Sequence, residues 1–296
     1  LALRPMIRPQ KFNAIIELIR LDRPVGTLLL LWPTLTALWL AAEAVPAFWI
    51  LCTFIVGTFV MRAAGCVAND IVDRHIDPFV ERTKSRPLAD GRLSLFEAII
   101  VFAALSTLGF ALMFTLNVIT RWLAVAGFCI AIVYPFMKRV TFFPQVILGI
   151  AFSWGIPMAS TAVREDLSTP ICLFFLMSVI WIIAYDTQYA MVDRRDDRTI
   201  GVRSTALLLG EWDRLAIGLM QSVSVILLFV LGEYCGFQIP YSLAIATVAG
   251  LFIYQQILIR SRDETNCLKA FGNNTWVGFT IFIGVVAEHL IGTFAT

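Results

Sequence analysis

"VGTLLLLWPTLTALWLAA" fills residues 25–42 and carries no charged side chain. A helix crosses the hydrocarbon core of a bilayer with about 20 residues, in a range of about 17–25. The whole chain is similar in character, because 59% of its residues are hydrophobic, only 15% are charged, and its mean hydropathy is +0.81. A chain with so few charges cannot cover a surface that faces water, so lipid must be the solvent for most of it.

Eight further uncharged runs follow the first one, and the run at 122–137 is the shortest. Runs this long fit helices rather than barrel strands, and a helix satisfies its own backbone polar groups inside lipid. The sequence therefore predicts an all-α, polytopic membrane protein in which nine transmembrane helices form a single domain over residues 1–296. The predicted spans are 25–42, 44–61, 98–120, 122–137, 140–163, 167–185, 215–232, 234–259 and 270–287.

Lysine and arginine lie on alternate sides of these nine spans. They gather in residues 4–23, 74–92, 138–139, 194–214 and 260–269, whereas the opposite loops offer only Arg121 and Arg164. Loops rich in Lys and Arg remain in the cytoplasm, so we expect a cytoplasmic N-terminus and an outer C-terminus. Apolar residues at helical spacing within 11–21 predict an interfacial helix inside the cytoplasmic segment 1–24.

One group of charges stands out in this apolar chain. In "CVANDIVDRHIDPFVERTKSRP", residues 66–87, the side chains of Asn69, Asp73 and Asp77 stand at i, i+4 and i+8. On a helix that spacing predicts one face, with about 6 Å of rise between neighbours, while Asp70 points elsewhere. Carboxylates stacked in this way repel one another at neutral pH unless a cation lies among them.

The pattern occurs a second time in "YDTQYAMVDRRDDRTIGVRS", residues 185–204. Tyr189, Asp193 and Asp197 follow their counterparts at a constant separation in sequence, and a glycine, Gly91 or Gly210, then opens a helix-like segment in each copy. The two copies, 69–77 and 189–197, predict a pair of pseudo-repeats with two sites that face one cavity. A solvated charged face would explain one such motif, but it does not explain two in matched register.

Hard oxygen ligands at this density suit Mg²⁺, which takes one or two carboxylates and completes its shell with water and phosphate oxygens. Arg82 and Arg86 lie beside the first motif, and guanidinium groups bind phosphate in a bidentate manner. Acidic residues, Mg²⁺ and arginine at a membrane surface predict a diphosphate substrate, and the apolar spans predict a lipid tail on it. The net charge of +2 indicates no nucleic-acid partner.

At this point the chain resembles the UbiA superfamily of intramembrane prenyltransferases, and most closely the members that prenylate 4-hydroxybenzoate. The resemblance extends over nearly the whole chain, with the motifs in the expected order and both acidic motifs intact. The matching stretches are "LDRPVGTLLLLWPT" at 21–34, "MRAAGCVANDIVDRHID" at 61–77, "RTKSRPL" at 82–88, "YPFMKR" at 134–139 and "AYDTQYAMVDRRDD" at 184–197.

The resemblance implies a nine-helix bundle around a central cavity that opens sideways to lipid and is capped by the cytoplasmic loops. It also implies the reaction, in which a polyprenyl diphosphate condenses with the ring carbon ortho to the hydroxyl of 4-hydroxybenzoate and releases diphosphate, in ubiquinone biosynthesis. Another aromatic acceptor remains an alternative within the superfamily: homogentisate, dihydroxynaphthoate, haem or a chlorophyll precursor.

The expected roles follow from this reaction and from the residues present. One Mg²⁺ is assigned to the first motif and a second to Asp193 and Asp197. The ligands of the first are Asn69, Asp73 and Asp77, and the diphosphate clamp is Arg82, Arg86 and Lys138, with Arg198 and Arg203 as further candidates. Tyr189 is expected to form a hydrogen bond or to face the allylic cation rather than to bind metal.

An arginine within a span is costly and usually faces a functional cavity. Arg62 lies seven residues before Asn69, on nearly the same helix face, so we expect Arg62 or Arg139 to bind the carboxylate of the aromatic acid. Arg23 is expected to help close the mouth and Asp186 to accept a proton. Tyr134 and Trp154 are candidates for facing the cation.

A secondary transporter is the rival from another class, because transporters also combine repeats with membrane carboxylates. Transporters place those carboxylates near the bilayer midplane, whereas here they stand at the ends of two spans.

The six cysteines show no paired spacing and are expected to be free. No segment rich in Arg and Ser precedes the first span, which favours a bacterial inner membrane over a mitochondrial one.

Overall fold

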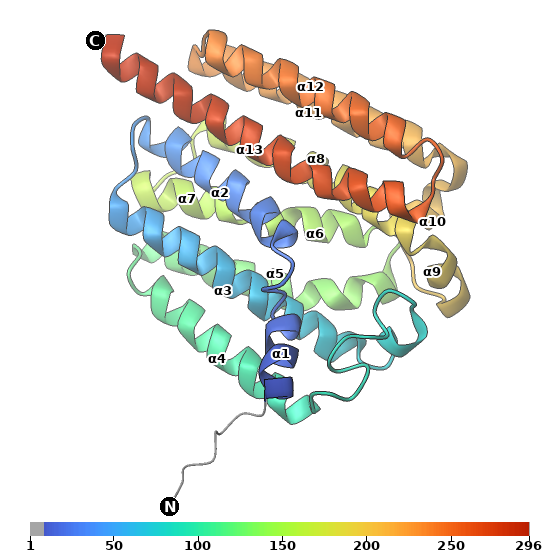
Figure 1. Ribbon diagram of the computed structural model, residues 1–296. Helices are drawn as coiled ribbons and strands as arrows, with labels where there is room; N and C mark the ends of the chain where they lie inside the picture. Colours follow the sequence, from blue (N-terminus) through green and yellow to red (C-terminus); the bar gives the residue numbers. More distant parts are fainter. Residues whose placement is uncertain (1–8, 296) are drawn as a thin grey trace, which may run out of the picture.

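The computed structural model describes residues 9–295, and long helices dominate that stretch (Figure 1). Two short 3-10 turns interrupt the α-helical pattern. The elements are α1 (Pro9–Leu18), α2 (Val25–Ala42), α3 (Phe48–Asp73), η1 (Asp77–Phe79), α4 (Leu95–Met113), α5 (Val118–Val140), α6 (Pro144–Ser153), α7 (Gly155–Arg164), α8 (Thr169–Val192), α9 (Arg194–Ile200), α10 (Thr205–Leu209), η2 (Gly210–Trp212), α11 (Asp213–Cys235), α12 (Ile239–Leu258) and α13 (Glu264–Ala295).

Nine segments of the described chain are long and apolar enough to cross a membrane, which confirms the predicted polytopic, all-helical class. The pair α6 and α7 forms the fifth segment, and α10, η2 and α11 form the seventh. The predicted helix at 11–21 is α1, whereas Arg4 and Arg8 lie outside the described residues. All six cysteines are free, as expected.

Two of the predicted boundaries are wrong. The break between spans three and four falls at residues 114–117 rather than at Arg121, because Asn117 caps α5. The Asn117 side chain accepts a hydrogen bond from the backbone N–H of Thr120 at 2.9 Å, as an N-cap residue does. In addition, α3 continues from Met61 to Asp73, so the first acidic motif begins inside the second span.

The fifth span, predicted as one run over 140–163, divides at Trp154 into α6 and α7. The Trp154 indole N–H donates a hydrogen bond to the Leu123 carbonyl of α5 at 2.7 Å. At the start of α7, a Cβ on Gly155 would collide with the hydroxyl of Thr34. Glycine at this position therefore allows α7 to pack closely against α2.

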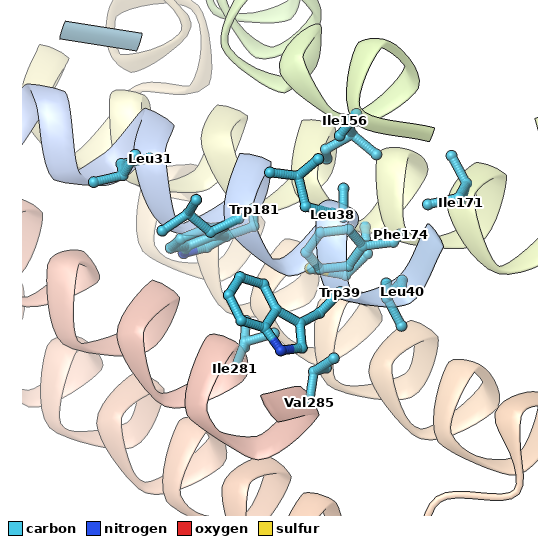
Figure 2. Packing of buried hydrophobic residues seen from close by; sticks show 14 of the residues in the cluster. Leu31, Leu38, Trp39, Leu40, Ile156, Ile171, Phe174, Trp181, Ile281 and Val285 are labelled. Carbon is cyan, nitrogen blue, oxygen red and sulfur yellow. The ribbon is translucent and has the colours of Figure 1, made fainter. Parts of the chain in front are cut away.

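Helix α2 lies at the centre of the core. Its side chains pack between α8, α7 and α13, as Figure 2 shows for Leu38, Trp39, Trp181 and Ile281. Trp39 also meets Phe282 edge to face, with the ring centroids 5.3 Å apart. A helix that is apolar on all sides suits this position, because protein surrounds most of its surface.

A chain of buried amides links the four helices α8, α11, α12 and α13. The Gln188 and Gln221 side chains both donate to the Gln255 carbonyl oxygen, at 3.0 and 2.8 Å. Asn274 donates to Gln188 at 3.0 Å and accepts from the Trp181 indole at 2.8 Å. Polar side chains that hydrogen-bond between helices stabilise helix association in lipid.

We expect Asn274→Leu to lower the free energy of unfolding by about 1–2 kcal/mol, because it leaves the Trp181 N–H and a Gln188 oxygen buried without partners. Thermal unfolding in detergent micelles measures the change. Thr247→Val is the matched control, since Thr247 is exposed and bonds only to Leu243 of its own helix. Equal stability of the two variants would contradict a structural role for the amide chain.

Candidate active site

The two acidic motifs meet at one end of the bundle. In Figure 1 the segment between α3 and α4 lies beside α9 at this end, which we call the charged end. A direct hydrogen bond joins the two copies, from the backbone N–H of Glu81 to the Asp196 carboxylate at 3.1 Å. Gly91 and Gly210 both adopt positive φ angles, of 79° and 55°, just before α4 and α11. Each copy therefore has a glycine in the positive-φ region before its next long helix.

The predicted single face of the first motif extends only as far as Asp73, where α3 ends. Asp77 lies in the separate turn η1, so the expected i+8 position on the same helix is wrong. The physical reason is Pro78, which disfavours helical backbone at the residue before it. In the second motif, Asp193 likewise stands at the junction between α8 and α9, and Asp197 lies in α9.

Asp70 belongs to the first motif but has its own partners. Its side chain is only 1% exposed and accepts two hydrogen bonds from Arg20, at 2.7 and 2.8 Å. Arg86 donates to the same carboxylate at 3.0 Å. Sequence reasoning missed both Asp70 and Arg20 as site residues, since no spacing rule relates positions 50 residues apart.

Three of the expected diphosphate-binding residues, Arg82, Arg86 and Lys138, are paired with acidic residues. Arg82 from the first copy forms a fork-like pair with Asp193 of the second copy, and its Nε lies 2.9 Å from one carboxylate oxygen. Arg86 donates to Asp77 at 2.9 Å, and Lys138 bonds to Asp73. The basic groups thus offset the charge of Asp73, Asp77 and Asp193.

Burial shifts the pKa of two acidic residues at the charged end upward. Burial raises the pKa of Asp197 to about 7, and repulsion from Asp193 adds to the shift. Burial likewise raises the pKa of Asp77, against the attraction of Arg86. A carboxyl group with a raised pKa gains stability as an anion when a cation approaches it.

Arg198 and Arg203 do not join this group. The Arg198 side chain is exposed, and the Arg203 guanidinium donates to the Val140 carbonyl at 2.7 Å and lies over the Phe142 ring. Neither residue lines the cavity beneath the charged end.

That cavity has a volume of about 1380 Å³ and extends from the charged end between α2, α3, α4, α5, α6, α7 and α8. Its lining changes from charged residues at the mouth to apolar and aromatic ones further in. Predicted site residues that line it are Arg23, Arg62, Asn69, Arg82, Arg86, Tyr134, Trp154, Asp186 and Tyr189. Its apolar part includes Leu30, Phe54, Phe110, Leu116, Phe128 and Met158.

Arg62 reaches this cavity, whereas Arg139 does not. The Arg62 guanidinium bonds to the Cys66 sulfur and lies 5.8 Å from the centre of the Phe152 ring. Gly26 of α2 leaves room for it, because a Cβ there would collide with the guanidinium. Arg139 instead donates to the Val72 carbonyl at 2.8 Å, so only one of the two candidates faces the cavity.

Tyr185 is a second residue that sequence reasoning missed. Its side chain is 1% exposed, it lines the cavity, and its hydroxyl has no hydrogen-bond partner within the described residues. Tyr189, one helical turn further on, lies under the Arg82 guanidinium at 4.7 Å. The role of Tyr189 toward the allylic cation stays a prediction.

The donor set fits Mg²⁺. The Oδ1 atom of Asp73 is buried without a hydrogen bond. The Arg139 guanidinium lies 3.6 Å from this oxygen. No three carboxylate, imidazole or thiolate groups in residues 9–295 gather closely enough to hold a metal by themselves. Mg²⁺ does not need such a cage, because it takes one or two carboxylates and keeps waters and phosphate oxygens.

The chain is similar to curated bacterial enzymes over nearly its whole length. The chain is 54% identical over 276 residues to the 4-hydroxybenzoate octaprenyltransferase of Pectobacterium atrosepticum, covering 93% of this chain and 96% of that protein. It is 51% identical over 280 residues to the 4-hydroxybenzoate octaprenyltransferase of Providencia stuartii, covering 95% and 97%.

Solved structures share the fold. A UbiA homologue from Aeropyrum pernix K1 superposes with a TM-score of 0.78 at 25% identity, over 88% of this chain and 97% of that one. A UbiA homologue from Archaeoglobus fulgidus, solved with GPP and Mg²⁺, gives a TM-score of 0.72 at 17% identity, over 93% and 99%. A sequence model of the UbiA prenyltransferase family matches residues 30–283, and the chain belongs to that family.

Proposed function

We propose that this protein transfers a polyprenyl group from polyprenyl diphosphate to the ring carbon ortho to the hydroxyl of 4-hydroxybenzoate, and releases diphosphate, in ubiquinone biosynthesis. The observation that carries the proposal is that both acidic motifs pair with three basic side chains at the charged end of the bundle, where Arg82 and Arg86 also line a large cavity. The names of the similar bacterial proteins, matched over nearly their full length, support the aromatic acceptor.

Mg²⁺ would be held by Asn69, Asp73 and Asp77 at one site and by Asp193 and Asp197 at the other. It would supply positive charge against the diphosphate oxygens as the allylic C–O bond breaks. The Archaeoglobus fulgidus homologue was solved with GPP and Mg²⁺, and the donor set of this chain fits the same ion.

The diphosphate would bind through an exchange of partners. Arg82, Arg86 and Lys138 would leave their acidic partners and contact phosphate oxygens, and the freed carboxylates would be available to hold Mg²⁺. Preorganised positive groups that meet charge developing on a leaving group are usually the largest contribution to catalysis. The ion pairs hold both sets of groups together at the charged end.

The acceptor ring would lie deeper, with its carboxylate on Arg62 and its face near Tyr134. Carbon–carbon bond formation follows loss of diphosphate, and the ring proton passes to the Asp186 carboxylate. Asp186 lines the cavity next to Tyr185. The apolar lining excludes water, which would otherwise capture the allylic cation.

We further propose that the protein lies in a bacterial inner membrane with this mouth toward the cytoplasm, as the distribution of Lys and Arg predicts. Arg23 lies at the mouth, 3.4 Å from Asp22, in a position to help close it. A transporter is disfavoured because the acidic groups stand at the ends of α3 and α8 rather than at mid-span.

Asp73→Ala and Asp193→Ala are each expected to lower the rate of prenyl transfer at least about 100-fold, because each removes a carboxylate from one acidic motif. The measurement follows labelled 4-hydroxybenzoate into a lipid product with Mg²⁺ or with EDTA. Asp196→Asn is the matched control, since Asp196 contacts only a loop N–H, and it should retain most of the activity. Full transfer in EDTA would show that the reaction does not need the metal. Transfer to other aromatic acceptors, but not to 4-hydroxybenzoate, would contradict the proposed acceptor.

Arg82→Gln is expected to abolish turnover and yet to tighten Mg²⁺ binding about five-fold when diphosphate is absent, because it frees Asp193 from its ion pair. Calorimetric titration of Mg²⁺ into the detergent-solubilised protein measures the affinity. Arg121→Gln, at the opposite end of the bundle, should leave the affinity unchanged. Weaker Mg²⁺ binding in Arg82→Gln would argue against the exchange of partners.

Arg62→Gln is expected to raise KM for 4-hydroxybenzoate about 10- to 100-fold while KM for the polyprenyl diphosphate stays constant, because a charge-assisted bond to the carboxylate is lost. Steady-state kinetics with each substrate varied in turn separates the two constants. Arg139→Gln, outside the cavity, serves for comparison. A rise in KM for 4-hydroxybenzoate in that variant alone would assign the carboxylate to Arg139 instead of Arg62.

A further inference from the structure

A second groove lies on the outer flank of the protein, between α11 and α12. Figure 1 shows these helices as an antiparallel pair beside α13, on the side away from α4 and α5. The groove has a volume of about 1310 Å³ and shares no lining residue with the cavity described above. It begins at Trp212 and Arg260 at the charged end and passes between the helices toward Val225 and Ala249.

The walls of the groove are apolar and uncovered. Leu219 of α11 is 59% exposed, and Ile253 and Ile257 of α12 are 64% and 65% exposed. Small residues widen the floor, where Gln256 lies over Gly218 and donates a hydrogen bond to Gln221 at 2.9 Å. In a chain that spans a membrane, such walls face the acyl chains of lipids.

The charged end of the groove holds more positive charge than its acidic neighbours neutralise. Arg262 is already paired with the buried Asp213 at 2.9 Å, and Arg194 shares that carboxylate. Arg214 and Arg260 also line the groove, and neither guanidinium has a hydrogen bond or ion pair among the described residues.

Arg214 is partly buried, and its Nε atom is buried without a partner. The only carboxylate that lines the described groove is Glu211. Nearby Asp263 is occupied in capping α13, since it accepts hydrogen bonds from Ser261 and Asn266. Two free arginines thus stand against one acidic residue at the rim.

We propose that this groove binds an anionic phospholipid, with its phosphate between Arg214 and Arg260 and an acyl chain along Leu219 and Ile253. Basic pockets between membrane helices at the interfacial level are typical sites for anionic headgroups. Trp212, 69% exposed at the same rim, has the amphipathic ring that favours the headgroup region. A soluble phosphate would use the arginines but not the apolar walls.

The test compares lipid binding by the intact, detergent-solubilised protein in native mass spectrometry. The probes are phosphatidylglycerol, phosphatidylcholine with the same acyl chains, and free glycerol 3-phosphate. We expect selective retention of phosphatidylglycerol, and a decrease in its affinity of about 10-fold or more in Arg214→Gln/Arg260→Gln, because each arginine near an anionic headgroup contributes. Arg195→Gln/Lys269→Gln, which removes the same charge at exposed positions outside the groove, should retain the lipid.

Arg214→Lys/Arg260→Lys keeps the charge and should restore most of the binding, which separates a charge effect from a folding defect. Three results would overturn the proposal: equal loss of lipid in both glutamine variants, equal retention of phosphatidylcholine by the intact protein, or full competition by glycerol 3-phosphate. A dimer that forms through this groove and excludes lipid would overturn it as well. The proposal is independent of the prenyl-transfer reaction, since the readout is lipid binding alone.

Discussion

The ion pair between Arg82 and Asp193 joins the two halves of this protein at the place where their functions meet. Arg82 comes from the loop after α3, and Asp193 ends α8, so the pair ties the two acidic copies together across the bundle. The two side chains are only 24% and 15% exposed, so water does little to weaken their attraction. The loop after α3 and the junction of α8 with α9 are therefore held together by side-chain pairing.

Grouping so many charges at the end of an apolar bundle is costly unless each one finds a partner. The pairs Lys138 with Asp73 and Arg86 with Asp77 meet that requirement when no substrate is bound. The same pairs explain how the site can be ready for a diphosphate and for a cation at once. A phosphate group competes for the basic member of each pair, and a metal competes for the acidic member, so each ligand favours binding of the other.

Most of the outline follows from local rules. Uncharged runs of spanning length predict nine segments because lipid allows no unpaired backbone groups, and the spacing of Asn69 and Asp73 predicts one helix face. The failures are equally local in origin. The turn at Asp77 follows from Pro78 and the start of α5 from Asn117, and both are signals that hydropathy does not contain.

Composition and spacing were enough to predict the class of the protein, the duplication of its acidic motif and the kinds of residue at its site, because they express those properties directly. Which partners meet depends on the packing of the helices. That packing placed Arg62 rather than Arg139 in the cavity, joined Arg20 to Asp70, and left Arg214 and Arg260 without partners at the rim of an outer groove. Such choices depend on how helices distant in sequence pack together, and no periodicity along the chain records that packing.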